Sequence, residues 1–401
     1  MNTFYGVNPS VTSPNRVQNP SHLGIFTKSH VIRSPQGIQR LHDFLLQDQS
    51  AKLLPKERVC NCLKKRIDKD RLREVKYNED RKKAHWANVQ RCGSIWSCPV
   101  CAKQITEKRR QELKTALTKW KTLHQGSVYL LTLTFSHSPD QSLKSNLSGL
   151  KKAMKRFYET TRVQSIFKEL GIEHKIKGLE VTYGRNGWHP HHHVLLLANR
   201  HDYGFRDYQN ELTGLWIKAC INSGLNAPSM QHGLDLRNGY YAEQYVSKWG
   251  LEDEITKGHV KKGRAGGLTP FDLLQLSIED EIVHGRLPSK LFQEFAISMK
   301  GARQLVWSRG LKALLCIEEK TDQECAEETE QNAISLTTVE NYIFGLLCHY
   351  QKRHEYLKAL EFDYENGIFG SGTAEQLLIL LCERSLSESG ATETLSSSSD
   401  L

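Results

Sequence analysis

Hydrophobic and polar positions recur with clear periods in the middle of the chain and predict a series of strands and helices. Residues 127–135 are apolar and rich in β-branched and aromatic side chains, which is typical of a buried strand. Over residues 142–170 apolar side chains recur at spacings of three and four, as on one face of a helix, and Gly171 is suited to end it. Residues 174–183 and 191–198 read as two strands joined by a Gly-containing turn, so we expect a hairpin.

Further predicted elements complete a recognisable order. A helix is expected over residues 205–222, a short strand over 233–237 and another helix from Gly239. The order β-α-β-β-α-β-α predicts an α+β fold of the ferredoxin-like, split βαβ type, with an antiparallel sheet and helices on one side. In this plan the strand at 191–198 lies centrally, and the last helix crosses the sheet near it.

Composition shifts divide the chain into regions around this core. At 401 residues the chain can support two or three domains with their own cores. Hydropathy gives no apolar window long enough to span a membrane. We predict five regions: 1–50, loosely ordered except near 38–46; 51–125, basic; 126–255, the α+β domain; 256–315, a loop and accessory helices; 316–401, acidic and helical with a disordered tail from residue 385.

Charge is distributed unevenly, which matters more than its total. The net charge is +10 and the isoelectric point about 9.0. Residues 51–121 contain 21 Lys and Arg against 8 Asp and Glu, whereas residues 316–401 contain 5 against 17. A basic block suits phosphate contacts with nucleic acid, although a solvated charged helix has the same composition. The acidic region cannot hold DNA and is expected to be a partner surface, a brake on non-specific binding or solvated chain.

The run HPHHH at residues 189–193 is the first candidate for chemistry. In a strand His191 and His193 point to the same face, and two neutral imidazoles side by side are ligands for a divalent cation such as Mg²⁺ or Mn²⁺. A third ligand is needed. Glu180, on the neighbouring hairpin strand, is preferred. His189 is the alternative, because in an extended strand it points to the same face as His191 and His193. The ordinary alternative is a His-rich surface strand.

The predicted helix from Gly239 carries a second candidate group. Tyr241, Tyr245 and Lys248 follow one another at helical spacing and share a face. A phenol is a weak nucleophile at neutral pH because its pKa lies near about 10, but a nearby metal ion and a lysine ammonium favour the phenolate. The alternative is an amphipathic helix whose tyrosines pack on a core.

Cysteines upstream of the core have the spacing of a structural zinc site. Three form a C-x5-C-x2-C pattern: Cys92, Cys98 and Cys101. Cys62 is the expected fourth ligand, Cys60 is its alternative and His85 is a less favoured one. Disulfides or free thiols would also account for the cysteines, but the absence of a signal-peptide pattern predicts a reducing, cytoplasmic location.

With these residues in view, the chain resembles a known family. Three segments, in order, resemble the motifs of HUH endonucleases: LTLTF at 131–135, GWHPHHHVLLL at 187–197 and YVSK at 245–248. More closely, the chain is similar to the replication initiator (Rep) proteins of rolling-circle plasmids, also in the segments at 91–110, 261–274 and 292–312. The joint occurrence over about residues 90–312 is specific, whereas an HxH pattern alone is not.

The resemblance implies an activity and a role for each matched residue. Such proteins bind the double-strand origin of a bacterial plasmid, nick one strand through a tyrosine that stays joined to the 5′ end, and later rejoin the displaced circle. Tyr245 aligns with the nucleophile, His191 and His193 with the metal ligands, and Lys248 with a position near the phosphate or phenolate. A host helicase and the replication machinery are the implied partners.

One departure from the family pattern leaves the terminating step open. Many single-tyrosine initiators carry a glutamate four residues before the nucleophile, where this chain has Tyr241. Tyr241 is either a second nucleophile, as in certain phage initiators, or a packing residue with Glu243 or another acid in the terminating role. Glu243 lies on a different helical face from Tyr245, which counts against it.

Two other classes of function fit parts of the sequence. A transposase or relaxase of the same nuclease superfamily would act on transposon ends or a transfer origin. A non-catalytic nucleic-acid-binding module would use a similar sheet, but its sheet should present exposed aromatic platforms rather than His and Glu.

Overall fold

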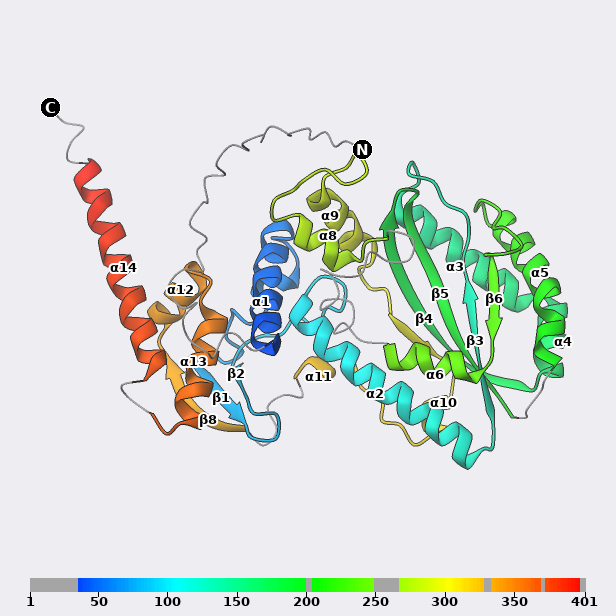
Figure 1. Cartoon of the computed structure of the whole chain (residues 1–401), viewed down its shortest axis with the longest axis horizontal. Coiled ribbons are helices and arrows are strands. Elements are labelled where there is room, and N and C mark those ends of the chain that lie inside the picture. The colour runs from blue at the N-terminus through cyan, green and yellow to red at the C-terminus, as the bar shows by residue number, and fades with distance from the viewer. Residues whose placement is uncertain (1–34, 200–203, 249–266, 328–332, 369–371, 397–401) are drawn as a thin grey trace, which may run out of the picture.

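The computed structural model describes residues 35–199, 204–248, 267–327, 333–368 and 372–396 (Figure 1). These residues form two lobes that lie side by side. We call residues 127–307 the sheet lobe, and residues 35–110 together with 322–396 the cysteine lobe. The helix α2 (Pro99–Leu123) runs from one to the other. Residues 1–50 were predicted to be loosely ordered except near 38–46; those before residue 35 lie outside the described residues, whereas 35–50 are helical. Residues 256–266, at the start of the predicted loop and accessory-helix region, also lie outside the described residues.

The sheet lobe is built on a five-stranded sheet among the described residues, in the order β6-β3-β5-β4-β7. Every neighbouring pair in it is antiparallel. The strands are β3 (Ser127–Leu133), β4 (Ile172–Gly184), β5 (Gly187–Ala198), β6 (Leu234–Arg237) and β7 (Leu305–Trp307). Without the edge strand β7, the spatial order β6-β3-β5-β4 is that of a split βαβ fold. This order confirms the predicted α+β, ferredoxin-like class.

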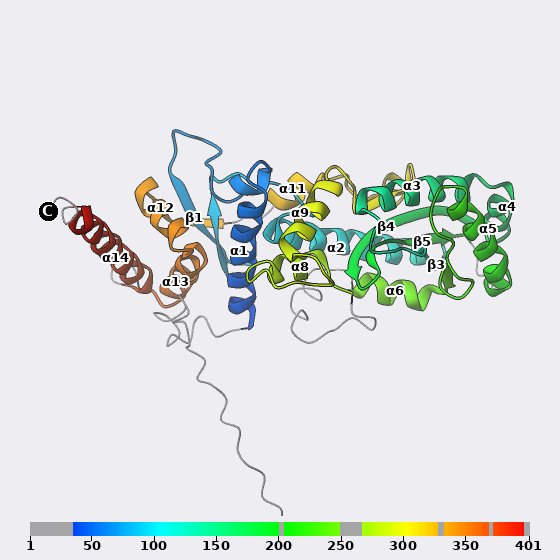
Figure 2. The ribbon, with the colours of Figure 1, turned by 90° about the horizontal axis from the view of Figure 1, so that it is seen from above.

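Helices cover both faces of this sheet, not one as predicted (Figure 2). One face carries α3 (Leu143–Glu159), α4 (Thr161–Glu169) and α5 (Gln209–Ile221), preceded by η2 (Gly204–Tyr208). The opposite face carries α2, α6 (Gly239–Lys248) and α10 (Leu311–Leu314). The reason lies in the strands, which are apolar on both sides in part of their length, as in the run 194–198, so each face needs cover.

Two predicted elements differ in detail. The helix predicted over 142–170 is divided at Thr160, whose extended backbone separates α3 from α4. Leu305 and Trp307 lie in the region predicted to contain accessory helices, but they form the edge strand β7 beside β4 and are only half-buried. The helices α8 (Pro270–Leu276) and α9 (Pro288–Ser298) pack between the lobes: Phe292 belongs to the core of the cysteine lobe and Phe295 to that of the sheet lobe.

The cysteine lobe combines segments from both ends of the chain. Its three-stranded sheet has the order β2-β1-β8, with β1 (Arg73–Asn78) and β2 (Lys83–Ala87) close in sequence and β8 (Ala333–Val339) far away. Around it lie α1 (Pro35–Leu53), η1 (Arg58–Asn61), α11 (Asp322–Glu327), α12 (Asn341–His349), α13 (Arg353–Glu365) and α14 (Thr373–Ser396). The sequence pattern had indicated helices but not this sheet.

A buried ion pair joins the two halves of the cysteine lobe. The Arg353 side chain, at the start of α13, is 1% exposed, and its Nη2 lies 2.7 Å from Oδ1 of Asp48 in α1. Lys64 reaches the same carboxylate at 2.9 Å from a more exposed position. A buried guanidinium needs such partners because desolvation of an unpaired charge is costly.

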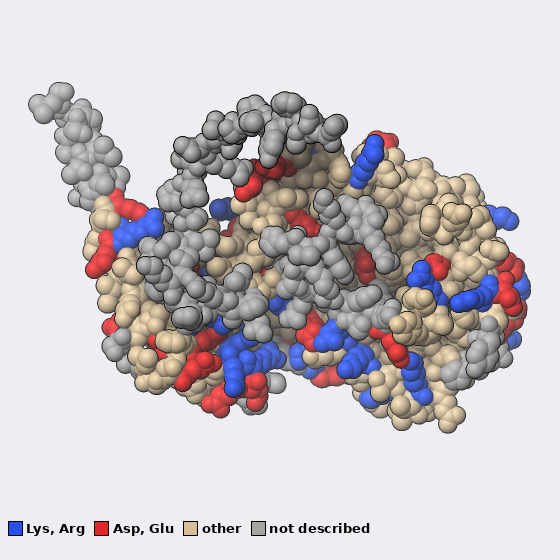
Figure 3. All heavy atoms as spheres, in the orientation of Figure 1, with Lys and Arg blue, Asp and Glu red and all other residues tan. Residues whose placement is uncertain are grey.

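Opposite charge blocks of the sequence meet in space. The basic residues 51–121 and the acidic residues 316–401 contribute to the same lobe, and Arg109 Nη2 lies 2.8 Å from Oδ1 of Asp322. On the face shown in Figure 3, basic and acidic side chains are interspersed in small groups. The acidic region therefore offsets part of the basic block within the folded protein.

The end of the described chain is more regular than predicted. α14 continues to Ser396, through most of the Ser-rich segment that we expected to be disordered from residue 385. Its first turns are anchored by buried Leu377 and Leu381, and extending an existing helix costs far less than starting one. None of the helices in the described ranges has the length and apolar character needed to cross a bilayer.

Candidate functional site

The alternation of β5 divides its side chains between the two faces of the sheet. Val194 and Leu196 pack toward α3 and α5, whereas Leu195 and Leu197 pack toward α2 and α6. Side chains two residues apart share a face, so His191 and His193 lie on the α6 face. They occupy the stretch just before the apolar run, where the sheet is only partly covered.

Glu180 completes a compact group with these histidines. It stands directly opposite His191 in the β4–β5 hairpin. Its Oε2 lies 3.4 Å from Nε2 of His191 and 3.6 Å from Nε2 of His193. One ligand atom from each residue lies within 4.8 Å of the others, so the group could hold a metal ion.

His189, the alternative third ligand, is held differently. Its ring stacks on that of His191 with centroids 4.8 Å apart, and on its other side it stacks on His137, also at 4.8 Å. It does not belong to the convergent group of Glu180, His191 and His193. Burial, together with the neighbouring imidazoles, lowers the pKa of His189 to about 3, so this ring is neutral.

Hydrogen bonds from the strands orient the imidazoles of the candidate pair. Thr132 Oγ1 on β3 lies 2.9 Å from Nδ1 of His193, and the backbone oxygen of His189 lies 3.3 Å from Nδ1 of His191. Both contacts occupy Nδ1 and leave Nε2 facing Glu180. Such second contacts fix the tautomer and the ring orientation of a metal-binding histidine. The sequence pattern did not indicate the part played by Thr132.

The electrostatics of the group fit a bound cation. Burial disfavours the charged form of His191, but the Glu180 carboxylate outweighs it and raises the pKa of His191. Burial lowers the pKa of His193. Without a metal ion the three side chains can form a Glu–His ion pair. With one, two imidazoles and a carboxylate supply three of the roughly six ligands that Mg²⁺ or Mn²⁺ takes.

The tyrosine helix crosses the same face of the sheet. Ala242 and Val246 of α6 are buried in one cluster with Leu195 and Leu197, which share the face of the candidate metal group. Tyr245 lies in α6, directly before Val246. The side chains of Tyr245 and Lys248 lie outside the part of the chain whose side chains the structure describes.

Tyr241 and Glu243 are described and occupy different surroundings. The Tyr241 ring is 38% exposed, with the Arg237 guanidinium 4.7 Å from its centroid. Glu243 forms an ion pair with Lys121 of α2. Glu243 is thus directed to α2.

The cysteine lobe contains a second candidate metal group. The sulfur atoms of four buried cysteines lie within 4.8 Å of one another: Cys62, Cys92, Cys98 and Cys101. Measured separations are 3.5 Å from Cys62 to Cys101, 3.7 Å from Cys92 to Cys101 and 3.8 Å from Cys98 to Cys62. The fourth position is held by Cys62, at the end of η1, and not by Cys60 or His85.

This geometry fits tetrahedral zinc and not a disulfide. With Zn–S bonds of about 2.3 Å, sulfur atoms at the corners of a tetrahedron are about 3.8 Å apart, whereas disulfide sulfurs are about 2.05 Å apart. Backbone N–H groups point at the sulfurs, from Cys92 to Cys62 at 3.4 Å and from Ser94 to Cys92 at 3.5 Å. Burial raises the pKa of the Cys98 thiol, so a cation is needed to hold all four thiolates together.

An antiparallel ferredoxin-like sheet with a Glu–His–His group on the face crossed by a tyrosine helix, beside a four-cysteine cluster, matches the plan expected of the Rep class. The family model described as "Replication protein" matches residues 82–356, and the chain belongs to this family. The match runs from β2 to α13 and therefore includes the sheet lobe and much of the cysteine lobe. The resemblance to Rep proteins that the sequence indicated is confirmed.

Individual curated relatives share 24–28% identity with the chain over part of its length. The chain is 24% identical over 295 residues to a "Protein rep" of Streptomyces lividans, covering 57% of this chain and 64% of that protein. It is 28% identical over 126 residues to a "Protein rep" of Bacillus amyloliquefaciens, covering 30% and 35%. A "Neomycin resistance protein" of Streptomyces cyanogenus is 28% identical over 142 residues, covering 29% and 32%. The match thus spans less than two thirds of each relative, and no solved structure matches significantly.

Proposed function

We propose that this protein initiates rolling-circle replication of a plasmid by nicking one strand of its double-strand origin. The observation that carries the proposal is the convergence of Glu180, His191 and His193 on the face of the sheet that α6 crosses. Membership in the replication protein family favours a replication origin over a transposon end or a transfer origin.

The proposed reaction is a transesterification by Tyr245. Its phenol loses a proton, the phenolate oxygen forms a bond to the scissile phosphorus, and the bond from phosphorus to the 3′ oxygen breaks. The products are a 5′-phosphotyrosine and a free 3′-OH from which a polymerase can extend. A later attack on the phosphotyrosine by another hydroxyl releases the tyrosine and closes the displaced strand.

The other residues bind and position the reacting groups. Glu180, His191 and His193 would hold a divalent cation, which stabilises negative charge on the phosphate oxygens when bound. Thr132 holds His193 in the ligating tautomer. Lys248, in the same helix as Tyr245, is assigned to neutralise the phosphate or the phenolate, because a lysine ammonium is a compact cation.

The cysteine lobe is proposed to hold a structural zinc ion and to contact the origin duplex. Exposed basic side chains project from the segments next to β1 and β2, namely Lys65, Lys69, Arg71, Arg81 and Lys82. Phosphate contacts of this kind supply salt-sensitive affinity without base specificity. A host helicase and the replication machinery are the partners that the reaction requires.

A non-catalytic single-strand-binding module is the less favoured function. Such a sheet would present aromatic rings as stacking platforms. In this sheet Tyr129, Tyr183 and Trp188 are buried toward α3 and α5. On the face toward α6 the described strands β4 and β5 carry Glu180, His191 and His193, and Trp307 lies half-buried on the edge strand β7.

Nicking of a supercoiled plasmid that carries the origin tests the proposal. The wild-type protein with Mn²⁺ should convert the plasmid to open circles and leave the protein joined to a 5′ end. Tyr245→Phe should do neither, while Tyr240→Phe, an exposed tyrosine on the same helix, serves as the matched control. Wild-type nicking and 5′ capture by Tyr245→Phe would refute the assignment.

A further inference from the structure

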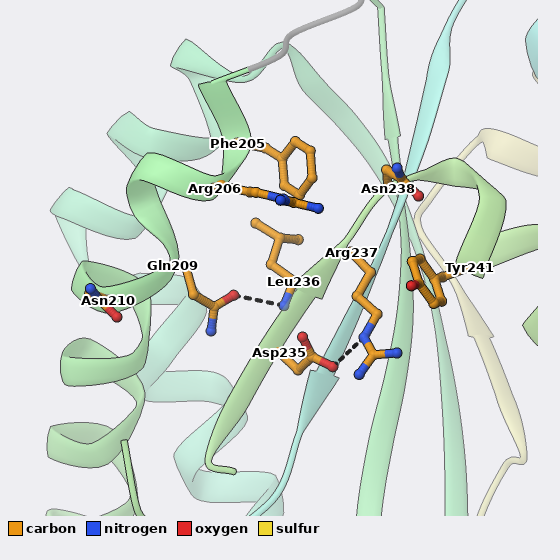
Figure 4. Close-up of a pocket in the computed structure, with 9 residues that line it drawn as sticks. All are labelled: Phe205, Arg206, Gln209, Asn210, Asp235, Leu236, Arg237, Asn238 and Tyr241. Carbon is orange, nitrogen blue, oxygen red and sulfur yellow. Dashed lines mark hydrogen bonds and ion pairs between the residues drawn. The ribbon is translucent and has the colours of Figure 1, made fainter. Parts of the chain in front are cut away.

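A pocket lies at the edge of the sheet lobe, outside the residues assigned so far to metal binding (Figure 4). It has a volume of about 380 Å³ and opens between η2 and the start of α6, over the edge strand β6. The side chains that give it chemical character are Phe205, Arg206, Asp235, Arg237, Asn238 and Tyr241.

The lining pairs cations with aromatic rings. In Figure 4, Phe205 and Arg206 from η2 face Arg237 and Tyr241 across Leu236. The Arg237 guanidinium lies 4.7 Å from the Tyr241 ring centroid, and that of Arg206 lies 5.9 Å from the Phe205 centroid. Both arginines are exposed. Guanidinium groups and aromatic faces are the groups that bind the phosphates and bases of single-stranded nucleic acid.

The floor of the pocket is held rigidly by Gln209. Its Nε2 donates to the backbone oxygen of Leu234 at 2.6 Å, and its Oε1 accepts from the backbone N–H of Leu236 at 2.9 Å. These bonds occupy the amide and pin α5 to the outer edge of β6, where no further strand pairs within the described sheet. The edge is therefore a fixed surface that does not need to rearrange to receive a ligand.

The pairing of the strands places Asp235 of the pocket in line with His193 of the candidate metal group. Asp235 pairs with Thr132, and Thr132 pairs with His193, so the three residues form one row across β6, β3 and β5. Two strand spacings separate Asp235 from His193, which is roughly 10 Å. Asp235 also forms an ion pair with Arg237 at 2.5 Å.

We propose that this pocket binds one nucleotide of the single-stranded DNA next to the scissile phosphate. Arg206 and Arg237 contact its phosphates, the Tyr241 ring contacts its base, and Asp235 and Asn238 face the polar edge of the base. The pocket is thus a positioning site for the strand, and it rests on the proposed nicking function. A carboxylate at the base edge favours a base with an amino group over thymine.

Fluorescence anisotropy without added Mg²⁺ or Mn²⁺ tests this site without cleavage and leaves the proposed structural zinc in place. The probe is a labelled mixed-sequence single strand of about 20 nucleotides, long enough to cover one such binding site. Arg206→Ala and Arg237→Ala should each weaken its binding about 5- to 10-fold and reduce the salt slope by about 0.7 per lost phosphate contact. Duplex of the same sequence should bind each variant as it binds wild type.

Controls separate this site from general charge effects. Arg156→Ala removes an exposed arginine from α3 that does not line the pocket, and it should leave single-strand binding unchanged. Asp235→Asn should reduce the preference for an oligo(dC) probe over an oligo(dT) probe. Thermal melting of each variant shows whether the fold is retained.

The outcomes distinguish the pocket from the nicking function. Single-strand binding by both arginine variants within twofold of wild type would refute the pocket. Failure of the wild-type protein to nick, with the binding losses as expected, would refute only the proposed function.

Discussion

Thr132 and His193 lie opposite each other on adjacent antiparallel strands, with Oγ1 of Thr132 2.9 Å from Nδ1 of His193. The contact ties the first motif of the sheet to the histidine motif. It directs Nε2 of His193 toward Glu180, so the threonine acts on the metal group through the histidine that it positions.

Removal of this hydroxyl should weaken metal binding without removing a ligand. Thr132→Val is expected to lower Mn²⁺ affinity about 10- to 100-fold, the usual effect of losing such a contact. Electron paramagnetic resonance titration of free Mn²⁺ measures it. Thr132→Ser should restore affinity, and Thr134→Val, which removes a hydroxyl bonded to the His232 backbone oxygen, is the control. Equal affinity of the valine variant and wild type would contradict the positioning role.

The choice between Glu180 and His189 as third ligand is testable by the same titration. Glu180→Gln should reduce Mn²⁺ affinity at least about 10-fold because it removes the anionic ligand. His189→Gln should change affinity less than about twofold, since this ring stacks on His191 and lies outside the convergent group. The reverse order of effects would make His189 the ligand.

Tyr241→Phe separates the two readings of the second tyrosine. If Tyr241 is a second nucleophile, the variant should nick at the wild-type rate but release few closed single-stranded circles. If Tyr241 is a packing residue against Arg237, phenylalanine keeps the ring and closure should proceed normally. Gel separation of open circles from closed single strands measures both steps.

Zinc should be required for the fold of the cysteine lobe. Cys98→Ser is expected to lose zinc, measured by atomic absorption, and to lower the melting temperature, because the four thiolates hold η1 to the start of α2. Cys60→Ser should keep both, as its thiol lies outside the group. Zinc retention by Cys98→Ser with an unchanged melting temperature would count against a four-cysteine site.

The two cations on Asp48 should differ in their contribution to stability. Arg353→Leu should lower the free energy of unfolding by about 3–5 kcal/mol, because it disrupts a buried ion pair. Lys64→Met, which removes the more exposed partner of the same carboxylate, should cost less than about 1 kcal/mol. Urea denaturation followed by tryptophan fluorescence measures both, and equal losses would contradict the burial argument.

The sheet lobe could be predicted because the strands that carry its candidate site, β4 and β5, are neighbours in the sequence. Alternation along residues 191–198 and the neighbouring turn determine which residues face α6, and this pattern alone predicts that His191, His193 and Glu180 lie together. The sequence did not predict that helices cover the α6 face of the sheet as well. The helix α2, which lies on that face, precedes the sheet in the chain, and its apolar positions do not indicate which surface it packs against.

The cysteine lobe was less predictable because its contacts span most of the chain. Residues 333–339 have strand-like composition, but their partner β1 lies more than 250 positions away, and no local pattern carries that pairing. Cys62 was the expected fourth ligand, with Cys60 as its alternative. The turn of η1, which buries Cys62 and leaves Cys60 half-buried, decides between them.

The pairing of β8 with β1 sets an order on biosynthesis. A ribosome completes the whole sheet lobe before it makes β8, so β1 must wait for its neighbour while the intervening residues already fold. A chain released early would carry the histidines and tyrosines, but the edge of β1 that pairs with β8 would be exposed, which favours aggregation. Interrupted translation is therefore expected to yield insoluble fragments and not a soluble fragment that carries the candidate site.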